Sequence, residues 1–178
     1  MYREETVWDG KRILTLKDIF PERMKVLFVG LNPSPVSVQA GHYHQGTLGK
    51  RFWARLVEYQ ILEDVIAGRE DESLSKYRYG ITDIIKKPTR RADGLTKRDF
   101  NIGRSILREK IRSHNPKVVA FIYKKASEKL FGYSLTNQFG LLRETIENVQ
   151  VFIFPGPYAR KEEERKFMTD FKHLTDSL

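Results

Sequence analysis

The segment Val26-Leu27-Phe28-Val29-Gly30-Leu31-Asn32-Pro33 indicates the fold of this chain. A short apolar run that contains β-branched residues ends abruptly at Gly30 and passes into an Asn-Pro turn. Such a run, bounded by Gly and Pro, is typical of a strand that is buried on both faces, as in parallel sheets. Ligands of open parallel sheets bind just beyond the carboxyl ends of the strands, so we expect Asn32 to lie at a binding site.

Further apolar runs alternate with helical patterns along the rest of the chain. We expect strands at 79–85, 118–122 and 151–154, and helices at 51–60, 97–114, 125–130 and 160–174. Residues 16–21 are interpreted as a short helical turn and 34–50 as a loop. Because strands that alternate with helices form layered folds, the sequence predicts one α/β domain over residues 1–178, with a mostly parallel central sheet in a three-layer α/β/α sandwich.

The chain is basic and contains no cysteine. Lys and Arg number 32 against 23 Asp and Glu, which gives a formal net charge of +9. This excess suits a polyanionic partner such as nucleic acid, because phosphate contacts come mainly from Lys and Arg. The absence of Cys excludes disulfides, iron–sulfur clusters and thiol nucleophiles. No apolar run approaches the roughly 20 residues that span a bilayer, and no signal-peptide core follows Met1, so we expect a cytoplasmic protein without a membrane partner.

Two loops that follow predicted strands carry the candidate functional residues. In a parallel sheet, loops 30–51 and 155–160 would open on the same edge. Aromatic rings, an amide and basic side chains gathered there would suit a flat base joined to a phosphate backbone. The candidates are Asn32, Ser34, Ser37, His42, Tyr43 and His44 in the first loop, and Tyr158 and Arg160 in the second.

Five short motifs occur in the order in which a known family carries them. Gly30-Leu31-Asn32-Pro33 is similar to the Gly-Ile-Asn-Pro motif of the mismatch-specific uracil/thymine-DNA glycosylases, within the uracil-DNA glycosylase superfamily. The segments that resemble the family's other motifs are Gly41-His42-Tyr43-His44, Arg51-Phe52-Trp53, Tyr79-Gly80-Ile81-Thr82-Asp83 and Pro155-Gly156-Pro157-Tyr158-Ala159-Arg160. Taken alone, Asn before Pro is also a common turn residue. The ordered companions favour the functional interpretation, and the resemblance covers residues 26–160.

The resemblance implies a monofunctional DNA glycosylase with a uracil-DNA glycosylase-like fold. Such an enzyme flips a damaged nucleotide out of DNA and hydrolyses the bond between base and sugar. By similarity, Asn32 is the catalytic residue and positions the attacking water, while Gly30, Leu31 and Ser34 belong to the base-binding pocket. Backbone N–H groups near Leu31 and Ser34 would stabilise the negative charge of the departing base. No metal or other cofactor is implied, and a site for one lesion predicts a monomer.

The resemblance leaves the preferred base open. The ring that stacks on the base falls on His44 or, after a shift of one residue, on Tyr43. Ser37 stands where uracil-restricted members have Ser, which favours uracil over thymine. Ser34 replaces the family's second Gly, so hypoxanthine or another deaminated base such as xanthine is also a candidate.

Binding of double-stranded, mismatched or deaminated DNA would involve the second loop. The resemblance places DNA contacts on Arg51, Pro157, Tyr158 and Arg160, with Tyr158 as the wedge that enters the space left by the flipped nucleotide. Residues 86–91 form a basic loop that either touches DNA or is a solvated face. A competing hypothesis is a lesion-binding protein that keeps the fold without turnover, and it predicts salt-sensitive binding to mismatched DNA and no abasic product.

Overall fold

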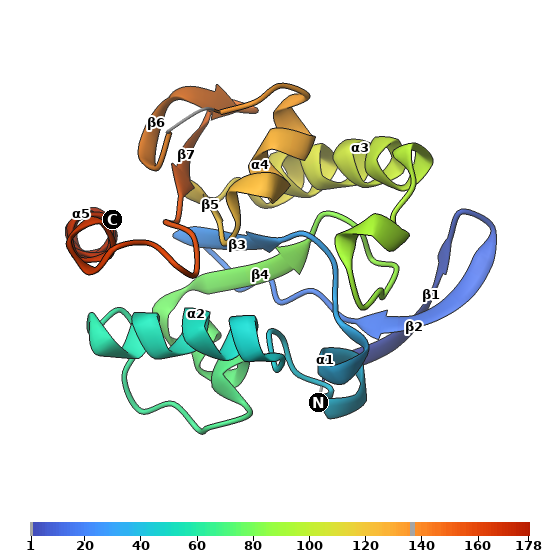
Figure 1. Ribbon diagram of the computed structural model, residues 1–178, viewed down its shortest axis with the longest axis horizontal. Coiled ribbons are helices and arrows are strands. Elements are labelled where there is room, and N and C mark those ends of the chain that lie inside the picture. The colour runs from blue at the N-terminus through green and yellow to red at the C-terminus, as the bar shows by residue number, and fades with distance from the viewer. Residues whose placement is uncertain (1, 136–137) are drawn as a thin grey trace.

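A five-stranded sheet forms the centre of the molecule. The computed structural model describes residues 2–135 and 138–178, and its sheet has the strand order β4-β3-β5-β7-β6 (Figure 1). Four strands are parallel, and only β6 runs antiparallel, to β7. The mostly parallel sheet predicted from the sequence is thereby confirmed. The strands are β3 (Val26–Gly30), β4 (Tyr79–Asp83), β5 (Val118–Phe121), β6 (Gly140–Ile146) and β7 (Val149–Ile153).

Helices cover both faces of this sheet, which confirms the three layers. Figure 1 shows α2 and α5 on one side of the sheet and α3 and α4 on the other. The bounds are α2 (Thr47–Glu58), α3 (Lys97–His114), α4 (Lys124–Phe131) and α5 (Lys161–Asp176). Because side chains alternate along a strand, β3 contributes side chains to the contacts with both helical layers. Val26 and Phe28 pack towards α2 and α5, whereas Leu27 and Val29 pack towards α3 and α4.

The N-terminal part of the chain differs from the prediction. Strands β1 (Arg3–Trp8) and β2 (Lys11–Leu16) form a separate antiparallel hairpin through an Asp9-Gly10 turn. Asp-Gly is a strong hairpin signal, since both central residues of such a turn adopt positive φ. The helical turn expected at 16–21 is wrong, because Ile19 instead makes a β-bridge with Ile81 of β4.

The predicted loop 34–50 is wrong in part, since it contains two helical segments. Helix α1 (Pro35–Ala40) begins after Ser34, whose Oγ accepts a hydrogen bond from the Ser37 N–H at 3.2 Å. A Ser N-cap followed by Pro is a regular helix start. Helix α2 begins at Thr47, four residues before the expected start. Strand β6 was not predicted, because its residues alternate between exposed and partly buried positions at the edge of the sheet.

The hairpin is attached to the sheet layer by buried polar contacts. Trp8 Nε1 donates to Asp99 Oδ1 at 2.7 Å, and the Thr15 hydroxyl donates to the Lys86 carbonyl at 2.6 Å. Asp99 also completes the capping box of α3 with Thr96.

Across residues 2–135 and 138–178, no helix is long and apolar enough to cross a membrane.

Candidate active site

A cavity of about 520 Å³ opens at the carboxyl ends of β3 and β4. Its walls come from the turn after β3, the loop between α1 and α2, the loop after β4 and the start of α4. This is the edge at which the sequence placed Asn32. The polar and aromatic side chains that line it include Asn32, Ser34, Ser37, Tyr43, His44, Asp83, Thr89 and Tyr123.

Asn32 is held in one orientation mainly by two acceptors, with a longer contact of 3.3 Å from its Nδ2 to the Pro33 carbonyl. Its Nδ2 donates to the Lys87 carbonyl at 3.1 Å and to Thr89 Oγ1 at 2.8 Å. The Thr89 hydroxyl donates its proton to the Arg91 carbonyl at 2.8 Å. The Thr89 oxygen must therefore accept the hydrogen bond from Asn32. Because both partners are acceptors, the amide atom that faces them must be the nitrogen. The other amide atom, Oδ1, remains as an acceptor for a ligand or a water molecule.

Ser34 and Ser37 connect the turn after β3 to the next loop. Their hydroxyl oxygens lie 3.0 Å apart, and Ser37 Oγ also accepts from the Gln45 N–H at 3.0 Å. Ser37 is buried, and both residues line the cavity. They form part of the cavity wall, and they also fix the path of the loop that carries the two candidate stacking rings.

Tyr43 is a buried wall residue whose backbone and hydroxyl are both bound. Asp71 accepts from the Tyr43 N–H at 2.8 Å and lies 2.8 Å from His42 Nδ1. Burial raises the pKa of Asp71, although these hydrogen bonds act to lower it. The Tyr43 hydroxyl donates to Asp18 Oδ1 at 3.2 Å, and only 1 % of the residue is exposed. Tyr43 thus lines the cavity while its hydroxyl is bound to Asp18.

His44 lies beside Tyr43 in a left-handed backbone conformation with φ 56°. Its half-buried ring meets Phe52, Trp53 and Tyr123 edge-on, with centroids 5.4–6.1 Å away. Nε2 is buried and has no hydrogen-bond partner among the described residues. Burial lowers the pKa of His44 to about 4, so the imidazole is neutral at pH 7. Both stacking candidates from the sequence thus line the same cavity.

Asp83 is a cavity residue that the sequence did not single out as functional. It ends β4, is 2 % exposed, and its Oδ1 has no partner among the described residues. Burial raises the pKa of Asp83 to about 7, although Lys86 and Lys110 act to lower it. Gly30 makes room for this carboxyl group, because a β-carbon at residue 30 would lie 2.1 Å from Asp83 Oδ1.

A charge network with one buried and two partly buried members lies behind the cavity. Lys86 Nζ contacts Asp18 Oδ1 at 2.7 Å, and Lys110 Nζ contacts Asp18 Oδ2 at 2.6 Å. Burial opposes ionisation of Asp18, yet the two lysines lower its pKa overall. The residues of the basic loop predicted at 86–91 therefore have different roles. Lys86 is structural, whereas Arg90 and Arg91 lie at the cavity.

The second predicted loop, 155–160, is fastened to α2. Arg51 Nη1 donates to the Pro157 carbonyl at 3.2 Å, and Arg55 donates to the Pro155 and Gly156 carbonyls at 3.0 and 2.9 Å. The Arg51 guanidinium also lies 4.9 Å from the centre of the Tyr158 ring.

These contacts bring the predicted DNA-binding residues of the two loops together. Tyr158 is 77 % exposed, and Arg160 is exposed immediately before α5. A smaller cavity between Arg51 and Pro157 shares Leu48 and Tyr123 with the main one, so the loop borders the candidate site.

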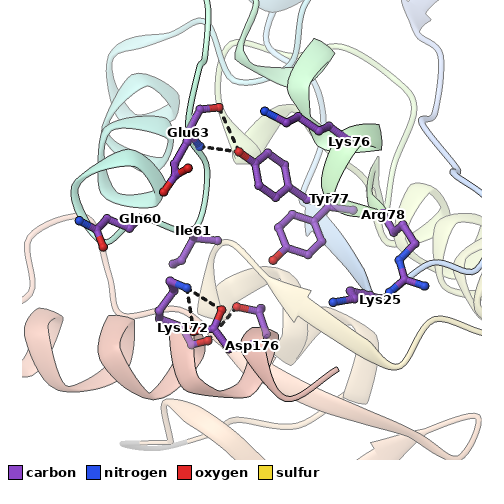
Figure 2. Close-up of a pocket in the computed structure, with 11 residues that line it drawn as sticks. Lys25, Gln60, Ile61, Glu63, Lys76, Tyr77, Arg78, Lys172 and Asp176 are labelled. Atoms are coloured by element: carbon purple, nitrogen blue, oxygen red, sulfur yellow. Dashed lines mark hydrogen bonds and ion pairs between the residues drawn. The ribbon is translucent and has the colours of Figure 1, made fainter.

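A second cavity, of about 460 Å³, lies at the opposite edge of the sheet, near the starts of β3 and β4. Figure 2 shows that its polar groups largely bind one another: the Tyr77 hydroxyl bonds to the backbone of Glu63, and Lys172 pairs with Asp176. None of its side chains has an orphaned buried polar atom among the described residues. The buried polar atoms that lack a hydrogen-bond partner among the described residues belong instead to the cavity beside Asn32.

A family comparison identifies the class of protein. The model of the uracil DNA glycosylase superfamily matches residues 17–176. The chain therefore belongs to the uracil DNA glycosylase superfamily, a class of DNA-acting hydrolases that function in DNA repair. Within the described residues, no group of three or more His, Asp and Glu side chains is arranged to hold a metal ion.

Proposed function

We propose that the protein is a monofunctional DNA glycosylase of the mismatch-specific type, which removes flipped-out uracil or a related deaminated base from duplex DNA. This reaction would initiate base excision repair, carried out by a monomer in the cytoplasm at the nucleoid. The observation that carries the proposal is the fixed amide of Asn32, whose nitrogen is held by Lys87 and Thr89 in the lining of a cavity of about 520 Å³.

The proposed reaction uses Asn32 to orient the attacking water. An amide is too weak a base to deprotonate water, but its Oδ1 can accept a hydrogen bond and aim the water oxygen at the sugar carbon. As the glycosidic bond breaks, the sugar becomes oxocarbenium-like and the base leaves with negative charge. Backbone N–H groups of Leu31 and Ser34 are candidates for stabilising that charge. Of the two candidate rings, Tyr43 is the one against which the base would lie.

Binding of DNA is supported by cations beside the cavity. A groove of about 810 Å³ between α3 and α4 shares Lys125 with it. Lys97, Arg104, Lys125 and Lys129 line this groove, and none of them is in an ion pair with another described residue. Cations without an ion-pair partner are available to phosphate oxygens, although Arg104 also donates to the Lys129 carbonyl and Lys129 Nζ lies 5.1 Å from the centre of the Phe100 ring. The exposed Tyr158 would serve as the wedge, with Arg51, Pro157 and Arg160 beside the duplex.

A single-turnover assay tests the proposal. Duplexes that contain uracil, thymine, hypoxanthine or xanthine are incubated with excess enzyme, and abasic sites are revealed by alkaline cleavage. We expect uracil to be released fastest. We expect Asn32→Ala to lower the rate by roughly 100-fold or more, as for removal of one positioned catalytic group. Glu58→Ala, at an exposed position of α2, is the control.

The assay also distinguishes the competing function. Unchanged base release by Asn32→Ala would refute the role of this residue. Salt-sensitive binding to mismatched duplexes, with no abasic product at stoichiometric enzyme, would instead identify a lesion-binding protein.

A further inference from the structure

Two buried polar atoms in the described part of the chain lack hydrogen-bond partners, and both belong to residues of the same cavity. They are His44 Nε2 and Asp83 Oδ1. Buried polar atoms in folded proteins are nearly always bonded, because an unpaired one loses its hydration without compensation. Two such exceptions in one cavity indicate that a molecule bound there, a ligand or a water, supplies the missing partners.

The two groups face a common space beside Gly30. The position of a β-carbon on residue 30 would be 2.1 Å from Asp83 Oδ1 and 3.2 Å from His44 Cε1, the atom bonded to Nε2. No hydrogen bond between the two side chains occurs in the structure of residues 2–135 and 138–178. Each is fixed by its surroundings, since Asp83 ends a central strand and His44 is enclosed by aromatic rings. Both residues line the cavity, so a planar ligand bound there would lie beside both.

We propose that Asp83 and His44 read the lactam edge of the flipped base: the neutral carboxyl group of Asp83 donates to a ring carbonyl, and unprotonated His44 Nε2 accepts from the adjacent ring N–H. This inference rests on the proposed glycosylase function and names the chemistry by which that site selects its substrate. It requires the His44 tautomer with its proton on Nδ1.

The lactam edge distinguishes deaminated bases from most of the normal bases that give rise to them. Uracil, thymine, hypoxanthine and xanthine carry adjacent C=O and N–H groups, whereas cytosine and adenine carry a ring nitrogen acceptor beside an amino donor. Guanine shares the lactam edge and differs by its amino group. The neutral acid also suits the reaction, because it donates to an oxygen on which negative charge develops as the base leaves. An ionised carboxylate at the same place would repel that charge.

The surroundings of Asp83 favour its neutral form. Burial and Asp18 raise the pKa of Asp83, whereas Lys86 and Lys110 lower it, and the net result is a pKa of about 7. His44 is itself neutral, since burial lowers its pKa to about 4. The titratable groups that face Asp83 come from the segment before β3 (Asp18), the loop between α1 and α2 (Tyr43, His44), the segment after β4 (Lys86), α3 (Lys110) and the residue before α4 (Tyr123).

The pH dependence of single-turnover uracil release tests the role of Asp83. We expect the wild-type rate to fall about tenfold per pH unit once Asp83 ionises, between about pH 8 and pH 9. Asp83→Asn keeps a donor that does not titrate, so it should remain within about tenfold of wild type near pH 6 and lose the alkaline fall. Asp83→Leu has no donor, so near pH 6 it should be about 100-fold slower than wild type, and it should show no alkaline fall. Asp170→Asn, an exposed carboxyl group on α5, is the control.

A modified substrate tests the role of His44. N3-methyluracil lacks the ring N–H but retains both carbonyl groups, so wild-type enzyme should release it about 100-fold more slowly than uracil. His44→Asn, which tolerates the left-handed backbone, keeps an acceptor and should retain more uracil activity than His44→Leu. Thermal melting of each variant confirms that it is folded.

The outcomes separate this inference from the function on which it rests. If wild-type enzyme forms abasic product but its alkaline limb persists in Asp83→Asn, or if Asp83→Leu keeps the wild-type rate, base reading by Asp83 is refuted while the glycosylase stands. Equal release of uracil and N3-methyluracil refutes the role of His44. If wild-type enzyme forms no abasic product with any base, both proposals fail.

Discussion

Gly30 and Asp83 are register partners at the carboxyl ends of β3 and β4, and the space that a side chain on residue 30 would need is occupied by the Asp83 carboxyl group. A β-carbon there would lie 2.1 Å from Oδ1 and 3.2 Å from His44 Cε1. The glycine is therefore required by the side chains opposite it rather than by its own backbone conformation. It allows the carboxyl group and the imidazole to stand beside the turn that carries Asn32.

Gly30→Ala should disturb the site and the fold together. The added methyl group must displace Asp83, which costs about 1–3 kcal/mol of unfolding free energy, as for other overpacked cores. Base release should fall as well, since both proposed base-reading groups shift. Denaturant unfolding and single-turnover rates measure the two effects. Gly156→Ala is the stability control, because a β-carbon at Gly156 meets nothing within 4 Å.

Asp18→Ala should be strongly destabilising. Its carboxylate pairs with both Lys86 and Lys110. Removing one partner of a buried ion pair leaves uncompensated charge, which typically costs about 3–5 kcal/mol. Chemical denaturation compares this variant with Asp64→Ala, which breaks the exposed Asp64–Lys76 pair and should cost less than about 1 kcal/mol. Similar losses in the two variants would contradict the structural role of Asp18.

Asp83 should make the protein less stable as pH rises. Its pKa is raised from 3.8 to about 7, so between these values the folded state binds more protons than the unfolded state. The free energy of unfolding therefore decreases with pH across this interval, by at most about 4 kcal/mol. Asp83→Asn removes the penalty, and its unfolding free energy should exceed that of wild type near about pH 9 and not near about pH 4. Equal pH dependence in both proteins would show that Asp83 ionises normally.

Arg51→Ala should weaken DNA binding through two effects. It removes a cation, and it releases the loop whose Pro157 carbonyl and Tyr158 ring Arg51 contacts. If the guanidinium also meets a phosphate, the slope of log affinity against log salt should fall by about one. Fluorescence anisotropy with a labelled duplex over a salt series measures this slope. Arg143→Ala, an exposed residue of β6, removes the same charge from the far edge of the sheet and should leave the slope unchanged.

The sequence predicted the parts of the fold that depend on local pattern. Helix α3 has the predicted bounds, because Thr96 and Asp99 form a capping box at one end and the apolar spacing continues to His114. Strand β3 was recognisable from its uninterrupted apolar run, and all of its residues are buried. Asn32 lies at the predicted cavity because the carboxyl ends of parallel strands share one edge.

The remaining site residues depend on contacts between distant segments. Asp83 is part of a motif quoted from the sequence, yet only its burial against Gly30 and the opening beside His44 distinguish it from an ordinary residue at the end of a strand. Lys86 is adjacent to Lys87 in a basic run, but it is buried on Asp18, 68 residues away. Such pairings are decided by tertiary packing, and no local pattern encodes them. The contacts of Arg51 with Pro157 are of the same kind.

The N-terminal hairpin has a consequence for how substrate preference can change. The family match begins at residue 17, but Leu16, the last residue of β2, lines the cavity, and its carbonyl accepts a hydrogen bond from Lys86. The hairpin therefore contributes one residue, just before the matched range, to the lining of the cavity. Substitution of Leu16 can therefore reshape the cavity without changing β3 and β4, whose carboxyl ends hold Asn32 and Asp83.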